Sequence, residues 1–265
     1  MQREEPPAMA TGLERIAAKA RCEPKFRFTT LAHHVTKERV WENLCQIPTD
    51  SAPRVDGQTV PEAKEGFGVW SEAMLQSLHR QGYQAPNIRR VYIPKPGKQE
   101  RRPLGVPCVA DRALQRSAAQ VLSGIYEQDF LPCSFGGRSG RGAHQGLATL
   151  HELIAGRKVE WVLEADLKNF FGNLSHEWML RFVEHRVGDP RLISLIRRWL
   201  KASVLEDEEL HPNEEGNPTR WFDQRLAEQC VSALRCARTN RVFPAGEIPA
   251  PTRGAAASPG IESWV

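Results

Sequence analysis

Asp166 is the residue at which metal-dependent chemistry could begin. It stands near the end of an apolar stretch, VEWVLEADL at residues 159–167, whose alternating residues predict a strand with one buried face. Mg²⁺ prefers carboxylate oxygens, and phosphoryl transfer by two metal ions places metal on both the attacking and the leaving oxygen. A carboxylate here could equally cap the next helix, so Asp166 alone does not define a site.

Two phenylalanines follow this aspartate after a short turn, and the spacing favours nucleotide chemistry. Phe171 stands five residues after Asp166, beside the position of a nucleotide held by the metal. A bulky ring there would exclude a 2′-hydroxyl group. Asn173 or Ser175 is expected to cap the helix that comes next.

Basic residues gather in one stretch, although the net charge of the whole chain is only +4. Between Pro86 and Arg116 two acidic residues, Glu100 and Asp111, are outnumbered by Arg89, Arg90, Lys95, Lys98, Arg101, Arg102, Arg112 and Arg116. Such a stripe suits a polyanionic ligand. A solvated basic face would explain the same composition equally well.

The elements that carry these charges are predicted from turn residues and periodicity. Residues 88–93 and 101–106 read as two strands of a hairpin connected through Pro96-Gly97. Lys95 lies between two prolines, which fix an extended backbone around it. A glycine-rich loop, SFGGRSGRGAHQGL, follows with Arg138 and Arg141, which could approach phosphates, although an ordinary loop has the same composition.

Helices are expected on both sides of that loop. The helix before the loop carries an apolar stripe of Leu114, Ala118, Val121, Leu122, Ile125 and Tyr126. The helix after it carries Ala143, Leu147, Leu150 and Ile154 on one face. A third helix begins at Pro190, and its buried stripe is Leu192, Leu195, Ile196, Trp199 and Leu200. Helices around strands that pair after long excursions predict an α+β or α/β fold.

Composition excludes several classes of protein. The chain of 265 residues allows one large domain or two small ones. It has no apolar run of membrane-spanning length, and its first residues have no secretory pattern. Six scattered cysteines without a C-x-x-C pair indicate reduced thiols rather than a zinc site. A cytoplasmic location is the expectation.

Several segments together resemble the reverse transcriptase encoded by bacterial group II introns, also called the intron maturase. RFTTLAHHV is similar to its amino-terminal extension, and SAPRVDGQTV to its S-A-P-G-V-D-G, with Arg54 in place of glycine. RRVYIPKPGKQERRPLGVP and SFGGRSGRGAHQGL resemble the two fingers motifs. Residues 162–218 resemble the palm strand and the helical insertion of intron-encoded enzymes.

The resemblance implies an α+β, right-hand polymerase fold and assigns site residues one by one. It makes Asp166 the first catalytic, metal-binding carboxylate, with the Leu167 carbonyl also facing a Mg²⁺ ion. It places Lys95 and Arg102 on the incoming triphosphate and makes Phe171 the gate that recognises the sugar. It places Arg89 and Arg90 near the template, and Arg138 is a further template-binding candidate. Gly172 departs from the family's frequent aspartate, which implies a lost helix cap worth about 1 kcal/mol.

The other carboxylates of a two-metal site do not follow. The family supplies them from a Y-A-D-D hairpin, and this sequence contains no Y-A-D-D. Codons for Trp221 to Leu234, read one nucleotide later, permit G-S-I-S-x-L-L-S-N-V-Y-L-H-Y, the family's expected sequence. We interpret this as a one-nucleotide frame change between Pro218 and Trp221; a diverged but genuine segment is the alternative.

The sequence thus predicts four parts: an amino-terminal extension (1–50), fingers (51–158), a partial palm with helical insertion (159–218) and an out-of-frame, disordered tail (219–265). The family function is RNA-directed DNA synthesis with assistance to intron splicing, so intron RNA and an RNA/DNA template–primer are the expected partners. This chain, lacking the second carboxylates, is expected to be inactive alone. The alternatives are an RNA-binding fragment without catalysis, a misfolding product, or half of a split enzyme.

Overall fold

The computed structural model describes residues 12–49, 55–94, 97, 99, 101–138, 140–156, 159–162, 175–207 and 209–213. Its helices are α1 (Gly12–Cys22), the 3₁₀ turn η1 (Ala32–His34), α2 (Lys37–Cys45), α3 (Val60–Glu65), α4 (Phe67–His79), α5 (Val109–Tyr126), α6 (Ala143–Gly156), α7 (His176–Arg186) and α8 (Pro190–Leu200). Its strands are β1 (Ile88–Pro94), β2 (Arg101–Val106), β3 (Val204–Glu206) and β4 (Glu209–His211). This mixture of helices and one sheet confirms the α+β class.

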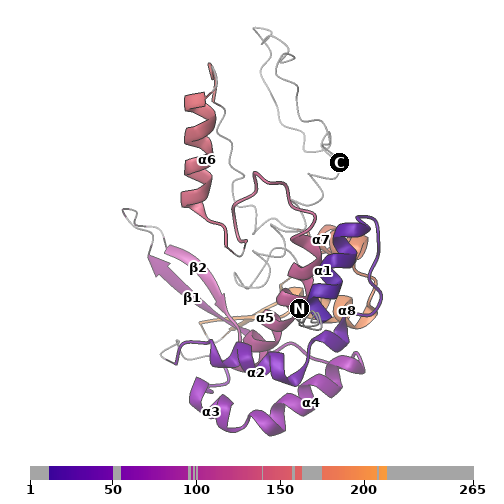
Figure 1. The fold of residues 1–265 in the computed structure, drawn as a ribbon. Coiled ribbons are helices and arrows are strands. Elements are labelled where there is room, and N and C mark those ends of the chain that lie inside the picture. Colours follow the sequence, from indigo (N-terminus) through magenta and orange to yellow (C-terminus); the bar gives the residue numbers. More distant parts are fainter. Residues whose placement is uncertain are drawn as a thin grey trace, which may run out of the picture.

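The sheet is small and is built around the predicted hairpin. Its strand order is β2-β1-β3-β4, with β1 antiparallel to β2 and parallel to β3. The hairpin bounds were predicted to within one residue, whereas β3 and β4 were not predicted. Figure 1 shows β1 and β2 projecting from the helical body.

Helix α5 forms the centre of the hydrophobic core. Its predicted stripe is confirmed, since Leu114, Ala118, Val121, Leu122 and Ile125 are fully buried. Helices α1, α2 and α3 pack against α5, and α8 packs against α4 and α7. Burial of large apolar side chains stabilises a fold by about 1.5–3 kcal/mol each, so this cluster holds the sheet and the loops in place.

Helix α8 begins with a buried carboxylate that reaches beyond its own helix. Asp189 is the N-cap residue and accepts from the backbone N–H of Arg191 at 3.0 Å. Its other oxygen accepts from the backbone N–H groups of Leu31 and Ala32 at 2.7 and 2.8 Å. Although burial acts to raise the pKa of Asp189, these hydrogen bonds and the Arg191 side chain lower it overall. One side chain thus caps α8 and fixes the start of η1.

The amino-terminal segment is joined to the end of α7 by backbone pairing. Phe28 forms a parallel bridge with Val187, donating to the Arg186 carbonyl at 2.8 Å and accepting from Gly188 at 2.6 Å. The buried Arg186 guanidinium donates to the carbonyl oxygens of Ala20, Glu23 and Pro24 and pairs with Asp129 at 3.0 Å. Segments at the two ends of the described chain therefore form one structural unit.

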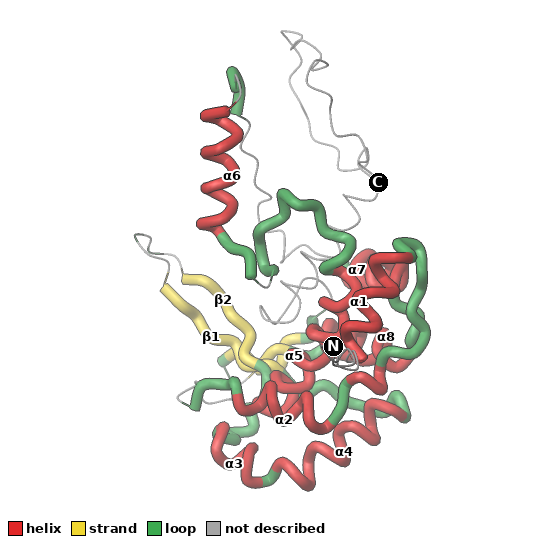
Figure 2. The backbone as a smooth tube through the Cα atoms, in the orientation of Figure 1, coloured by secondary structure: helices red, strands yellow, loops and turns green. Residues whose placement is uncertain are grey.

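Helix α6 and the residues after it differ from expectation. The helix is present, but none of its residues is buried, and Leu147, Leu150 and Ile154 are exposed. Figure 2 shows α6 standing apart from the helical body. Residues 159–162 form no strand, and Trp161 is 86% exposed. The predicted strand is therefore wrong over these four residues, because a strand forms only where a neighbouring strand accepts its hydrogen bonds. The rest of it lies outside the described residues.

Within the ranges that the structure describes, no helix combines the length and apolar character needed to cross a membrane.

Candidate nucleic-acid interface

The β1–β2 hairpin presents the basic stripe on a rigid, extended scaffold. Arg89 pairs in register with Val106, and Pro94 pairs with Arg101 at the other end of the ladder. Ile88 anchors the base of the hairpin, because it is buried and donates to the Ser203 carbonyl at 2.9 Å. The ladder holds the cations of both strands on one narrow projection, which suits contact with a phosphate backbone.

Arg89 and Arg90, the two predicted template contacts, point to opposite faces of the sheet, because successive strand residues alternate. The Arg90 guanidinium lies 3.5 Å from the Glu206 carboxylate on β3. The Tyr92 hydroxyl, two residues on and on the same face, donates to Glu206, and this bond raises the pKa of Tyr92. Arg89 is exposed on the other face. Glu206 was not identified from the sequence, because it lies on a strand that was not predicted.

The residues predicted to contact the triphosphate are only partly described. The Arg102 backbone lies in β2 opposite Ile93, and its side chain lies outside the described residues. Lys95 lies outside them altogether. Their roles on the nucleotide stay predictions.

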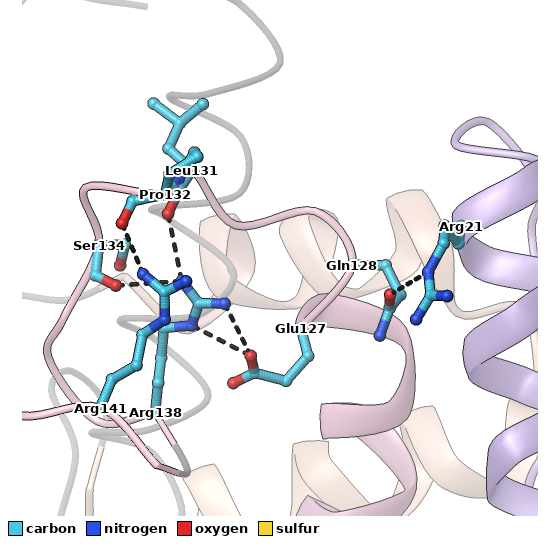
Figure 3. Close-up of polar contacts among 8 residues, drawn as sticks. All are labelled: Arg21, Glu127, Gln128, Leu131, Pro132, Ser134, Arg138 and Arg141. Carbon is cyan, nitrogen blue, oxygen red and sulfur yellow. Dashed lines mark hydrogen bonds and ion pairs between the residues drawn. The ribbon is translucent and has the colours of Figure 1, made fainter.

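The glycine–arginine loop is organised around Arg138, as Figure 3 shows. Its guanidinium donates twice to the Glu127 carboxylate, at 2.9 and 3.0 Å, and to the carbonyl oxygens of Leu131 and Ser134 at 3.1 and 3.0 Å. It also stacks over the Phe130 ring and is only 7% exposed. Arg138 therefore braces the loop from inside; its predicted contact with template stays untested.

Arg141 closes the same loop from its other end. It donates to the Pro132 carbonyl at 2.5 Å and lies over the Phe135 ring. Gly137 and Gly140 have φ values of 65° and 70°, a backbone region that favours glycine, which explains the glycines at these two positions. The loop's composition thus serves its own geometry.

The base of the hairpin is positioned by a buried polar cluster that sequence reasoning did not identify as a site. Asp111, in the first turn of α5, accepts from the Tyr83 hydroxyl, from Trp199 Nε1 at 2.7 Å and from Gln115 Nε2 at 2.8 Å. Burial raises the pKa of Asp111 to about 6, although these three donors act to lower it. The cluster ties α5, α8 and the segment before β1 together.

The predicted catalytic centre is formed by residues on and after the apolar stretch at 159–167. Asp166, Leu167 and Phe171 lie outside the described residues. Across the described ranges, no group of three His, Cys, Asp or Glu side chains is arranged to hold a metal ion. The metal-binding and sugar-gating roles therefore stay predictions.

The basic β1–β2 hairpin and the glycine–arginine loop braced by Arg138 lie on either side of α5 along the chain. The family model described as "Reverse transcriptase (RNA-dependent DNA polymerase)" matches residues 93–224, which include β2, the loop and the predicted Asp166. The chain therefore carries a reverse transcriptase domain over residues 93–224.

Relatives of the chain include proteins encoded by group II introns. It is 28% identical over 213 residues to the group II intron-encoded protein LtrA of Lactococcus lactis subsp. cremoris, covering 80% of this chain and 35% of LtrA. It is 28% identical over 249 residues to protein YkfC of Escherichia coli K12, covering 86% of this chain and 65% of YkfC. The chain therefore spans about a third of one relative and two thirds of the other.

A solved structure with a similar fold is the partial Cas6-RT-Cas1–Cas2 complex. The similarity has a TM-score of 0.48 at 21% identity and covers 77% of this chain and 34% of that chain.

Proposed function

We propose that the chain is the fingers and partial palm of a group II intron reverse transcriptase, an RNA-directed DNA polymerase that also assists intron splicing. The observation that carries this proposal is the family match over residues 93–224, with LtrA among the relatives. The proposed parts are the amino-terminal extension (1–50), fingers (51–158), a partial palm (159–218) and an out-of-frame tail (219–265).

The chain's own residues would act by binding and positioning nucleic acid. Arg89 and Arg101 are exposed on the hairpin and would contact backbone phosphates. Bound Mg²⁺ would supply charge stabilisation for phosphoryl transfer in the intact family. A two-metal site needs several carboxylates, and here the resemblance provides only Asp166. We therefore propose that this chain binds RNA but does not polymerise nucleotides alone.

Primer extension on an RNA template with Mg²⁺ tests the catalytic half of the proposal. We expect no extension product from the purified chain. Robust incorporation that disappears in Asp166→Ala would show that the chain holds a complete site after all.

Salt-dependent binding of single-stranded RNA tests the binding half and separates it from a misfolding product. Arg89→Ala and Arg101→Ala should each weaken binding and reduce the salt slope by about 0.7. Arg181→Ala, which removes an exposed arginine on α7, is the matched control and should change neither. A chain without a cooperative unfolding transition, or binding indifferent to both hairpin arginines, would contradict the proposal.

The proposed frame change is tested by the coding DNA. Around codon 218, the alternative frame should continue into a Y-A-D-D motif and a maturase domain. Stop codons or unrelated residues in that frame would leave the diverged-segment alternative.

A further inference from the structure

An open groove lies on the part of the helical body formed by α2, α3 and α4, outside the residues matched by the family model. These three helices contact one another and lie on the side of the body away from α6 (Figure 1). The groove has a volume of about 450 Å³ and is lined by Lys37, Glu38, Trp41, Lys64, Phe67 and Gly68. This volume is in the range of small-ligand sites, about 300–1,000 Å³.

Two aromatic rings form the apolar wall, and the structure holds one of them in place. Trp41 is 40% exposed, and its ring lies 4.8 Å from the ring of Phe67. Phe67 is fixed from behind by Trp70, whose ring meets it edge-on at 5.1 Å. Trp70 is itself anchored, because its Nε1 donates to the Ala63 carbonyl at 2.7 Å. The groove therefore offers preorganised aromatic surface to solvent.

The charges around these rings favour an anionic ligand. Lys37 Nζ lies 6.0 Å from the Phe67 ring centroid, and Lys64 lines the same groove. The one carboxylate in the lining, Glu38, is held at the start of its own helix. Hydrogen bonds there, first from its backbone N–H and then from the Thr36 side chain, lower the pKa of Glu38. Glu38 is thus held toward the α2 amino terminus, and the two lysines supply the cations of the groove.

We propose that this groove binds an unpaired base of single-stranded RNA, with the base against Trp41 and Phe67 and a neighbouring phosphate against Lys37 or Lys64. Aromatic surface combined with cations is the chemistry of sequence-tolerant single-strand binding. A proline-rich peptide would use the aromatic wall but has no need of the lysines. The choice of RNA as ligand rests on the proposed function, whereas the site itself is separate from the hairpin.

Binding of the full chain to a fluorescein-labelled oligouridine of about twelve nucleotides, followed by anisotropy, tests the site. Trp41→Ala should weaken binding about tenfold, because one stacking surface is lost. Gly68→Met should weaken it by at least as much. A Cβ at Gly68 meets nothing within 4 Å, so the methionine fills the groove without disturbing the fold. At least one of Lys37→Ala and Lys64→Ala should reduce the salt slope by about 0.7.

Trp178→Ala is the matched control. Trp178 is also 40% exposed, lies beside a phenylalanine at 6.0 Å and carries a stacked arginine, but it is on α7, away from the groove. This variant should bind within about twofold of the unmodified chain. An oligomer of the same length without bases should bind weakly, and equally to all variants.

Other results would overturn the proposal. Oligouridine binding unchanged by both Trp41→Ala and Gly68→Met would remove the groove as an RNA site. A proline-rich peptide could also displace the oligouridine. If Trp41→Ala and Gly68→Met abolish this displacement but leave RNA binding intact, the groove is a peptide site. If RNA binding depends on the hairpin arginines but not on Trp41, the proposed function stands and the groove proposal is wrong. If RNA binding depends on Trp41 but not on those arginines, the groove proposal stands and RNA binding by the hairpin is wrong.

Discussion

Replacing the buried carboxylate at position 111 should stabilise the fold above neutral pH. In Asp111→Asn the amide oxygen can still accept from Tyr83 and Trp199, and no charge is buried. The new amide nitrogen needs an acceptor, and Gln115 can provide it by flipping its side-chain amide. Gln115 Oε1 is buried and has no hydrogen-bond partner among the described residues, so the flip pairs Oε1 with the new amide and moves Nε2 to the unpaired position, with no net change in the number of paired polar atoms.

The size of the effect follows from the pKa of Asp111 in the folded state. That pKa is raised from 3.8 to about 6 by burial, so the folded chain binds the proton more tightly than the unfolded chain. The difference of about 2 units corresponds to about 3 kcal/mol, which is the cost of ionising the group inside the fold. Protonation relieves this cost as pH falls through 6. By linkage, the original chain should gain about 1 kcal/mol relative to Asp111→Asn between pH 8 and pH 5.

Urea unfolding of both chains, followed by tryptophan fluorescence at pH 5, 6, 7 and 8, measures this difference. Asp111→Ala serves as the control, because it leaves the Tyr83 and Trp199 donors unpaired and should be destabilised by about 2–5 kcal/mol at every pH. A stability difference between the original chain and Asp111→Asn that does not change with pH would refute the reasoning. A difference of opposite sign would mean that the three donors outweigh desolvation.

Three further predictions concern other parts of the chain. Asp189→Ala should lower the free energy of unfolding in urea by about 3–5 kcal/mol, because the buried N–H groups of Leu31 and Ala32 lose their acceptor. Arg191→Ala should lower it by about 1 kcal/mol. Equal losses in the two variants would contradict the bridging role of Asp189. Limited proteolysis should cut the glycine–arginine loop sooner in Arg138→Ala than in Arg141→Ala, since Arg138 makes the more buried contacts; equal rates would argue against the brace. In a frame-restored protein, Phe171→Ala should cost about 1–3 kcal/mol of selectivity for deoxynucleotides, measured as a ratio of kcat/KM; an unchanged ratio would remove Phe171 as the gate.

Local patterns predicted the elements whose neighbours are close in sequence. The period of α5 and α8 and the turn residues of the β1–β2 hairpin are confirmed in the structure. Ser175 caps α7, accepting from the Trp178 N–H as expected.

Long-range partners could not be predicted from local patterns. The residues around Asp189 predict an ordinary N-cap. Nothing near it in the sequence indicates that its second oxygen accepts from Leu31 and Ala32, which stand 158 and 157 positions earlier. The Arg138 side chain was interpreted as a phosphate contact because its half-buried partner, Glu127, stands 11 residues earlier in the chain with no recognisable motif. The apolar stripe of α6 predicted helix correctly, but periodicity does not reveal what, if anything, covers it.

The bridge between Asp189 and the amino-terminal segment also sets a timing requirement for synthesis. Leu31 is made 158 residues before the carboxylate that accepts its N–H. At roughly 5–20 residues per second, translation takes about 8–30 s to cover that distance. Phe28, which pairs with Val187, waits about as long. The segment around Leu31 therefore leaves the ribosome well before its partners and is among the last parts to be fixed, so the described core closes only after α7 and Asp189 have been translated.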